Sequence, residues 1–398
     1  MKLERAQRLT AEPAQASRPD PAEFLLDACR VGRPLGDDPA APRTIEPVAD
    51  WAWLLAEAER HAVTPLLFRR LAAWPDLAPP HILATLRARF DENALRNLTL
   101  ARQLASLLQR LAASGVDAMP IKGPTLALAS YGDLALREFA DLDIVVRPRD
   151  FDRARALLGG WGYTPHTNIT SAGEHALRSS DHHLPLVSEE EHLVVELHWT
   201  LGRGRLGRDD AWVWSNVRKV SILGLETPAL SWSALLVYLC AHGSAHCWTR
   251  LGWVRDVAGV LAAAPPGELR EAVELAAAAS ARRRLALGVM LAHELLGAPV
   301  PEELELSADG AVTLLVKQVR AALFADGGLG AARTMAFQCR TRDTVVDMAR
   351  YCLHILAAPH VADVKAMPLP EWLGGRLYYA IRPVRLVVKR VMSLMRSR

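Results

Sequence analysis

Three acidic residues in two short apolar stretches carry the strongest chemical signal in the sequence. Asp141 and Asp143 stand in the run ADLDIVV, and Glu196 stands in LVVELHW. Side chains two apart in a strand point to the same face, so a strand over ADLDIVV places the two aspartates side by side. Ionised carboxylates this close repel each other, and the arrangement becomes favourable when a divalent cation such as Mg²⁺ bridges them. The pair is therefore a candidate metal site.

Glu196 strengthens this interpretation because it lies among valines and a leucine, where an unpaired carboxylate would be costly. A role as third metal ligand would explain it. The alternatives stay open: a DxD pair often only faces solvent at a sheet edge, and Glu196 can do the same on an edge strand. His198 shares the face of Glu196 if this stretch is a strand, so it is a candidate accessory residue. A purely helical interaction protein would leave Glu196 unexplained.

A glycine turn precedes the acidic pair in the sequence. The stretch VDAMPIKG predicts a short strand that ends at Lys122 and Gly123, and Pro124 suits the first position of a new helix. Glycine lets the backbone approach a phosphate, and the positive N-terminal end of the helix attracts an anion. A lysine-glycine pair alone is more often an ordinary turn. The order of the parts carries the prediction: glycine turn and helix, then two carboxylates, then one.

The residues in this order resemble a known family. The segment IKGPTLALASYGDLALREFADLDIVV, followed by VVELHW, resembles the bacterial uncharacterised nucleotidyltransferase family of the DNA polymerase beta superfamily. The shared motifs are the lysine-glycine turn, the Tyr-Gly-Asp segment at 131–133, Arg137 and the DLD strand. The resemblance covers most of residues 50–260, whereas the last third of the chain resembles the family only in being helical.

The resemblance implies a metal-dependent transfer of a nucleoside monophosphate from a nucleoside triphosphate, such as ATP, to a hydroxyl of a small molecule, peptide or protein. It implies that Asp141, Asp143 and Glu196 are the catalytic and metal-binding residues, with Mg²⁺ or Mn²⁺ as the cofactor. The residues assigned to nucleotide binding are Lys122, Gly123, Thr125 and Arg137, and for Arg137 a surface or structural role stays open as well. The wider superfamily usually has serine after its glycine, where this chain has Pro124. An inactive nucleotide-binding or scaffolding protein of the same fold is therefore the alternative function.

Two histidines four residues apart form a second pattern. His242 and His246 lie in a strongly helical stretch and so share one helix face, a spacing that can hold zinc. No third ligand is evident nearby in the sequence. Structural hydrogen bonding, contact with the acceptor or nucleotide, and metal binding all remain open for this pair.

Hydrophobic spacing predicts the elements that position these residues. Residues 1–22 are polar, contain prolines and are expected to form a flexible leader. Apolar residues three and four apart predict helical domains over 23–113 and 227–398, while 114–226 alternates predicted strands and helices. The predicted fold class is α+β, with a small mixed β-sheet nucleotidyltransferase core flanked by the two helical domains. Residues 166–192 are expected to form an excursion loop or hairpin.

Composition and charge exclude several other classes of protein. Hydrophobic residues make up 51% and charged residues 23%, as in folded globular proteins, and a net charge of +3 does not predict bulk nucleic-acid binding. Five scattered cysteines without a CxxC pair argue against a disulfide framework. The absence of a signal sequence predicts a cytoplasmic location. Residues 376–398 form a basic amphipathic segment that either packs on the helical domain or makes weak contact with an anionic membrane surface or an acidic partner.

Overall fold

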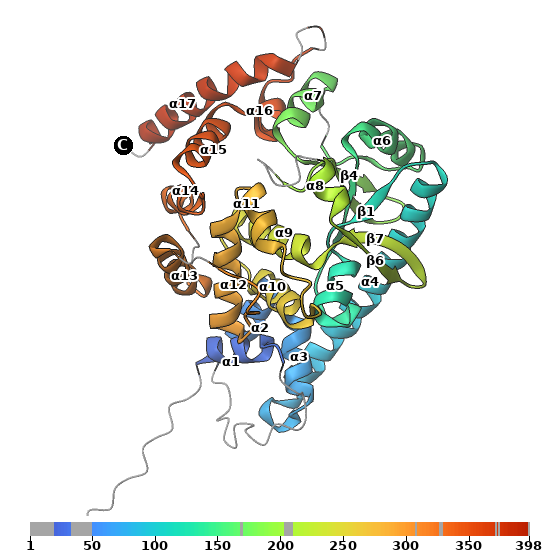
Figure 1. Cartoon of the computed structure of the whole chain (residues 1–398), viewed down its shortest axis with the longest axis vertical. Coiled ribbons are helices and arrows are strands. Elements are labelled where there is room, and N and C mark those ends of the chain that lie inside the picture. The colour runs from blue at the N-terminus through green and yellow to red at the C-terminus, as the bar shows by residue number, and fades with distance from the viewer. Residues whose placement is uncertain are drawn as a thin grey trace, which may run out of the picture.

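The structure is a computed structural model in which a small sheet is surrounded by helices. It describes the following residues: 20–32, 50–167, 170–202, 210–306, 309–325, 329–370, 372 and 375–396. Nearly all of the predicted leader over 1–22 lies outside the described residues. In Figure 1 the sheet lies on one side of the molecule, with helices α9 to α12 in the centre and α13 to α17 along the opposite side. The α+β prediction is confirmed.

Aspartate and proline residues set the starts of the N-terminal helices. The side chains of Asp20 and Asp50 accept hydrogen bonds from backbone N–H groups two and three residues further along, as N-caps do. Pro65 and Pro80 stand in the first turns of the next two long helices, where a missing N–H costs nothing. The elements are α1 (Pro21–Cys29), α2 (Trp51–Arg60), α3 (Thr64–Ala72), η1 (Pro75–Leu77) and α4 (Pro80–Ala113). The described part of 23–113 consists of these helices and their connections, and its bounds as a domain stay a prediction.

A five-stranded mixed sheet forms the centre of the next segment. Its strand order is β1-β2-β5-β4-β3, with β2 parallel to β5 and the other pairs antiparallel. The strands are β1 (Ala118–Pro120), β2 (Asp141–Val146), β3 (Thr164–Pro165), β4 (His183–Ser188) and β5 (Leu193–His198). The register places Asp143 opposite Glu196 and His183 opposite His198. Helices cover the sheet, which explains why almost every residue of β2 is buried.

Short helices connect the strands of this sheet. They are α5 (Pro124–Tyr131), η2 (Leu134–Leu136), η3 (Pro148–Asp150), α6 (Phe151–Gly160) and α7 (Ser171–Ser180). The prediction of a loop or hairpin over 166–192 is right only for its second half, where β4 turns into β5. Helix α7 occupies the first half because Thr170 caps it and because Ala176 and Leu177 pack against Val364, far along the chain. Local sequence does not reveal that partner.

Helices dominate the rest of the chain after one small hairpin. The hairpin joins β6 (Val217–Ile222) to β7 (Leu225–Leu230) and spans the expected domain boundary between 226 and 227. The helices of this part are α8 (Asp210–Ser215), α9 (Trp232–Ala245), α10 (Leu251–Ala263), α11 (Ala272–Ala278), α12 (Arg282–Leu296), α13 (Gly310–Leu323), α14 (Ala331–Arg340), α15 (Val345–Ala357), α16 (Val361–Ala366), η5 (Gly375–Leu377) and α17 (Tyr378–Arg396).

Two large hydrophobic clusters hold these parts together. The first joins the N-terminal helices to α9, α10 and α12, with Leu54 and Val257 among its fully buried members. The second lies between the sheet, α6 and the C-terminal half of α4, with Leu104 and Ile144 among its members. Helix α4 contributes to both clusters, since Leu86 belongs to the first. The helices that precede and follow the sheet in sequence thus share one core.

The C-terminal helix α17 packs on its neighbours through part of its basic face. Arg382 donates to Asp363 Oδ2 at 2.7 Å, and Arg385 donates to the other oxygen of the same carboxylate. Val384 and Val387 on this helix are exposed. Contact with a membrane surface through residues 376–398 stays a prediction. Among the described residues, none of the helices combines the length and the apolar character needed to cross a membrane.

Candidate active site

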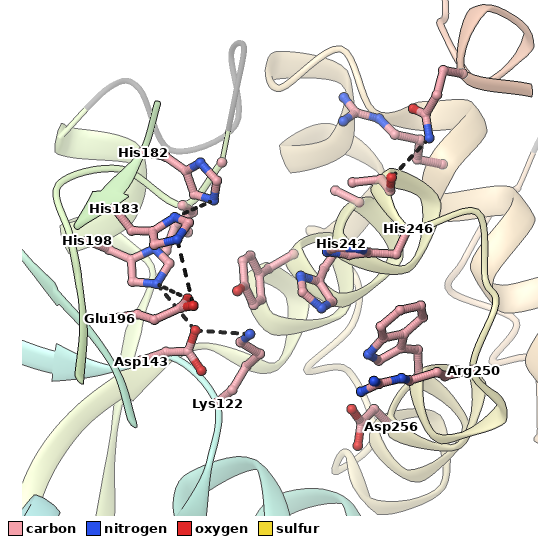
Figure 2. Close-up of a pocket in the computed structure, with 18 of the residues that line it drawn as sticks. Lys122, Asp143, His182, His183, Glu196, His198, His242, His246, Arg250 and Asp256 are labelled. Atoms are coloured by element: carbon pink, nitrogen blue, oxygen red, sulfur yellow. Dashed lines mark hydrogen bonds and ion pairs between the residues drawn. The ribbon is translucent and has the colours of Figure 1, made fainter. Parts of the chain in front are cut away.

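A cleft of about 1010 Å³ lies between the sheet and the C-terminal helices (Figure 2). One wall comes from the ends of the β-strands and the other from α9, α10, α12, α14 and α15. Residues of the sheet wall are Lys122, Asp141, Asp143, His182, His183, Glu196 and His198. Residues of the helical wall are Tyr238, His242, His246, Arg250, Trp253, Asp256, Arg284, Gln338, Arg342, Arg350, Tyr351 and His354. Most of the residues predicted from the sequence therefore line a single cleft.

Asp143 and Glu196 come together because β2 and β5 are parallel neighbours in register. Asp143 is only 2% exposed. His198 Nε2 lies 3.2 Å from Asp143 Oδ1 and 3.4 Å from Glu196 Oε2, so the imidazole bridges the two carboxylates. One candidate ligand atom from each of the three lies within 4.8 Å of the others. The three side chains are close enough to share one metal ion.

Asp141 is the first residue of β2 and lines the cleft beside this group. Its pKa is raised by burial and by the negative charges of Asp143 and Glu196. Among the described residues, the groups with metal-ligand spacing include Asp143 and Glu196 but not Asp141. The predicted triad is thus assembled as a close pair with a third carboxylate at its side. Electrostatic repulsion at Asp141 is what a bound cation would relieve.

Lys122 holds a buried ion pair with Asp143. The distance between Lys122 Nζ and Asp143 Oδ1 is 2.9 Å. Burial alone would lower the pKa of Lys122, but the charge of Asp143 outweighs it and the pKa is raised. Burial likewise opposes the charged form of Asp143, yet Lys122 and His198 hold the pKa of this carboxyl well below its usual range. Both groups are therefore charged at neutral pH, and the lysine compensates one carboxylate of the site.

The predicted glycine turn is present between β1 and α5. Gly123 has a φ of +59° at the N-cap of α5, a conformation that favours glycine. Thr125 is buried, and its hydroxyl donates to the carbonyl oxygen of Lys122 at 2.9 Å. Neither Gly123 nor Thr125 is among the residues that line the cleft. Their contact with a nucleotide stays a prediction.

Arg137 is engaged in a buried network with the helical wall. It donates from Nε to Asp256 Oδ1 at 2.9 Å and from the terminal NH2 group to Oδ2 at 3.1 Å. Tyr131 donates its hydroxyl to the same Oδ1 at 2.9 Å. The guanidinium fork is therefore turned toward Asp256 of α10. The predicted role of Arg137 in nucleotide binding is not tested by this geometry, but a structural role is directly visible.

His242 and His246 lie across the cleft from the carboxylates, on the helical wall (Figure 2). Their ring centroids are 4.7 Å apart, and the ring of Trp253 contacts both, at 5.7 Å from His242 and 4.9 Å from His246. Burial and the charge of Lys122 lower the pKa of both imidazoles, so they are neutral at neutral pH. Within the described part of the chain, neither belongs to a group with metal-ligand spacing. A contact surface for a ligand remains open for this pair.

Sequence reasoning missed two histidines of the sheet wall, His182 and His183. They stand at the start of β4, and the antiparallel register places His183 directly opposite His198. The signal was the pair of histidines immediately before the alternating run LPLV. It could be used only with the pairing of β4 and β5 in hand.

Comparison with known proteins supports the resemblance stated from the sequence. A model of the uncharacterised nucleotidyltransferase family matches residues 47–297, more than half of the chain. The comparison with curated proteins finds no match. One similar solved structure is an antigenic nucleotidyltransferase-like protein from Paracoccidioides brasiliensis, with 17% identity, 52% of this chain and 95% of that chain covered, and a TM-score of 0.33.

Another similar solved structure is the antibiotic-resistance factor ANT(2'')-Ia. Its identity to this chain is 12%, the similarity covers 50% of this chain and 94% of that chain, and the TM-score is 0.28. Bacterial origin and membership of the DNA polymerase beta superfamily stay predictions. Because the family model matches residues 47–297, more than half of the whole sequence, the chain belongs to the uncharacterised nucleotidyltransferase family.

Proposed function

We propose that this protein is a metal-dependent nucleotidyltransferase that transfers a nucleoside monophosphate from a nucleoside triphosphate to a hydroxyl of a small molecule, peptide or protein. The observation that carries the proposal is the pair formed by the buried Asp143 and the half-buried Glu196 on adjacent parallel strands, open to a cleft of about 1010 Å³. Family membership supports the same activity. The cleft volume reaches the upper end of the range of roughly 300–1,000 Å³ usual for ligand pockets.

The donor set of the sheet wall fits a divalent ion such as Mg²⁺ or Mn²⁺. Carboxylate oxygens are the ligands that these ions prefer, and burial together with the negative charges of Asp143 and Glu196 raises the pKa of Asp141, which a cation would offset. Asp141, Asp143 and Glu196 would hold the metal. When bound, it would stabilise the negative charge on the attacking and leaving oxygens of an in-line displacement at the α-phosphorus.

The protein groups would divide the remaining work. Glu196 would accept the proton of the attacking acceptor hydroxyl, and His198 orients this carboxylate through its 3.4 Å contact. Lys122 lies at the floor of the same site, and the N-terminus of α5 directs its positive end to the turn at Gly123. These two features would hold the phosphates. Attack forms the new phosphate ester bond, and pyrophosphate leaves.

The helical wall is the proposed position of the acceptor. Trp253 and the neutral imidazoles of His242 and His246 offer flat faces that a ring or an extended group can stack on. Arg250 and Arg342 lie over the rings of Trp253 and Tyr351, respectively, and add positive charge to this wall. This wall faces the carboxylates, so an acceptor bound there would present its hydroxyl toward the sheet.

Incubation of the full chain with each α-labelled triphosphate, Mg²⁺ or Mn²⁺ and a broad panel of acceptors tests the proposal. We expect label transfer and pyrophosphate release, both lost in Asp143→Asn and in Glu196→Gln. Since Asp143→Asn leaves the Lys122 charge buried without its partner, circular dichroism must accompany it, and Glu196→Gln gives the cleaner result. Asp76→Asn, at an exposed position outside the cleft, is the matched control. If the full chain binds none of the triphosphates, the proposal is wrong.

A catalytically inactive nucleotide-binding or scaffolding protein is the second candidate. One observation favours it. Pro124 stands where the superfamily usually has serine, and the nearest hydroxyl that could replace that serine is the one of Thr125. This hydroxyl already donates to the carbonyl oxygen of Lys122. This candidate predicts triphosphate binding without transfer to any acceptor. The same labelled-nucleotide experiment therefore separates the two functions.

A further inference from the structure

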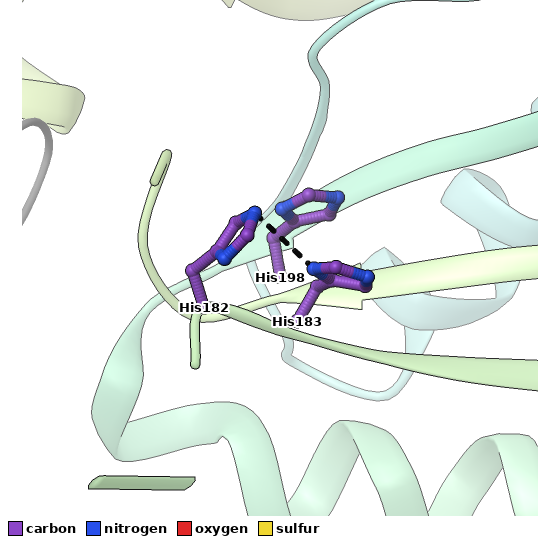
Figure 3. A group of neighbouring side chains, drawn as sticks. All are labelled: His182, His183 and His198. Carbon is purple, nitrogen blue, oxygen red and sulfur yellow. Dashed lines mark hydrogen bonds between the residues drawn. The ribbon is translucent and has the colours of Figure 1, made fainter. Parts of the chain in front are cut away.

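Three histidine rings gather where the chain enters β4 and leaves β5 (Figure 3), beside the carboxylate pair (Figure 2). His182 Nε2 lies 3.2 Å from His183 Nδ1. The rings of His183 and His198 are stacked with centroids 5.0 Å apart, and those of His182 and His198 are 5.5 Å apart. One ring nitrogen from each of the three lies within 4.8 Å of the others. This is the spacing of a group able to close on one ion.

His198 presents a nitrogen that the protein itself does not satisfy. The residue is 2% exposed, and its Nδ1 atom is buried without a hydrogen-bond partner. A buried polar atom left without a partner costs about 1–3 kcal/mol. Such atoms are rare in folded proteins, and where they occur they often contact a bound ion or water molecule. The unsatisfied nitrogen therefore points to a ligand in this cluster.

Carboxylates contact the other nitrogen of each ring. His182 Nδ1 lies 2.9 Å from Asp181 Oδ1, and His183 Nε2 lies 3.7 Å from Glu196 Oε1. His198 Nε2 lies within 3.4 Å of both carboxylates of the active site. A metal-binding imidazole usually has this arrangement, because a carboxylate on the far nitrogen fixes the ring and raises the basicity of the nitrogen that binds.

We propose that His182, His183 and His198 bind one Zn²⁺ ion, next to the carboxylate site and distinct from it. Zn–N bonds of about 2.0–2.1 Å in a tetrahedral site put neighbouring ligand nitrogens roughly 3.3 Å apart, close to the 3.2 Å between His182 and His183. Rotation of the rings would bring in the third nitrogen. Mg²⁺ prefers oxygen ligands, so the all-nitrogen set selects against it.

The ion would act by fixing the segment between α7 and β4 onto the end of β5. Three protein ligands leave one coordination position open to water. When Nδ1 of His198 binds the metal, the imidazole is fixed in the tautomer that carries its hydrogen on Nε2. This N–H then donates to Asp143 and Glu196 and orients both carboxylates. This role does not depend on nucleotide transfer. It holds equally for an inactive protein of this fold.

Metal titration of the full chain, stripped with a chelator and then dialysed, tests the site. Co²⁺ is the spectroscopic probe, because tetrahedral Co²⁺ absorbs strongly in the visible range, and calorimetry with Zn²⁺ gives the affinity. With excess Mg²⁺ present to occupy the carboxylate site, we expect one Co²⁺ per chain with a tetrahedral spectrum, displaced by Zn²⁺. His182→Ala should lower the Zn²⁺ affinity by more than about 100-fold, since loss of an outer carboxylate alone typically costs 10–100-fold.

Two variants decide where any bound ion lies. His175→Ala, at an exposed histidine of α7 outside the cleft, should bind Co²⁺ like the native chain. His182→Gln keeps a hydrogen-bonding side chain, and circular dichroism of both His182 variants in chelator checks their folding. Octahedral Co²⁺ alone, fully displaced by Mg²⁺, or unchanged Zn²⁺ affinity in the folded His182 variants, would assign the ion to the carboxylates and overturn the proposal. Absence of stoichiometric binding would overturn it as well.

Discussion

Replacing Asp256 by alanine should destabilise the folded protein by about 3–5 kcal/mol, because it leaves a buried guanidinium without its carboxylate. Asp256 is 3% exposed, and the Arg137 side chain is 12% exposed. Burial would lower the pKa of Arg137, but the charge of Asp256 outweighs it and the pKa is raised. The two residues belong to different parts of the chain, so the pair fastens α10 to the segment that precedes β2.

The contacts of the network give the size of the effect. Asp256 accepts two hydrogen bonds from Arg137 and one from Tyr131, all between 2.9 and 3.1 Å. Hydrogen bonds to a charged group contribute about 1.5–3 kcal/mol each to stability, and losses within one network are not additive. Tyr131→Phe removes one of the three and should cost about 1.5–3 kcal/mol. Asp256→Ala removes all three and leaves the positive charge unpaired, which places it at the upper end.

Urea denaturation followed by circular dichroism and by tryptophan fluorescence measures these free energies. A double-mutant cycle with Arg137→Met isolates the pair, and we expect a coupling energy of about 2 kcal/mol or more between positions 137 and 256. Asp76→Ala is the matched control and should stay within about 0.5 kcal/mol of the native chain. A coupling energy below about 0.5 kcal/mol would refute a structural role. It would then leave the guanidinium available for phosphates, as the sequence predicted.

Three further changes test other parts of the structure. Burial, with the charges of Arg60 and Arg250, lowers the pKa of His61 to about 3, so the unfolded chain alone takes up a proton below about pH 6.5. The free energy of unfolding should therefore fall as the pH is lowered from 6.5 to 3, and at pH 5 it should be about 2 kcal/mol lower than at neutral pH. His61→Asn should remove this part of the pH dependence. If the native chain and His61→Asn instead lose stability in parallel as the pH falls, the prediction is wrong. Gly243→Ala puts a methyl group 2.4–2.6 Å from atoms of the Trp248 ring and should lower the free energy of unfolding, measured by urea denaturation, by about 1–3 kcal/mol. An unchanged free energy of unfolding would show that the ring can move to make room for the methyl group. Gly123→Ala forces a positive φ on alanine and should cost on the order of 1–3 kcal/mol, and an unchanged denaturation midpoint would contradict this strain.

The strands of the site could be predicted because their sequences are locally unambiguous. Apolar residues surround Asp143 in β2 and Glu196 in β5, and both stretches are strands in the structure. The glycine turn and the helix after it were also predictable, since Gly123 and Pro124 each fix the backbone locally. Prediction succeeded where the controlling interactions lie within a few residues.

The rest of the site depends on pairings between distant segments. Arg137 meets Asp256 across 119 positions of sequence, and no local pattern announces that contact. His182 and His183 approach His198 only through the register of β4 on β5. Sequence spacing therefore predicted that the carboxylates lie near one another, but it predicted neither the partner of Arg137 nor the histidine cluster.

The helical wall of the cleft could not be predicted from the sequence either. Gln338, Arg342 and Tyr351 line it from α14 and α15, which lie after the segment that matches the family. Gln338 attaches α14 to the end of α9 by donating to the carbonyl oxygens of Ser244 and Ala245. A resemblance confined to the first two thirds of the chain could not place this wall opposite the carboxylates.

The two aspartates of the DLD strand illustrate what folding adds to a motif. In sequence Asp141 and Asp143 are equivalent, yet their surroundings move the pKa of the first up and that of the second down. The difference arises because Lys122 and His198 both contact Asp143, whereas Asp141 accepts no hydrogen bond within the described part of the chain. The lysine thus already neutralises one carboxylate of the site. Asp141 keeps a raised pKa because of burial and the negative charges of Asp143 and Glu196, so it is the carboxylate whose charged form a cation entering the cleft would stabilise most.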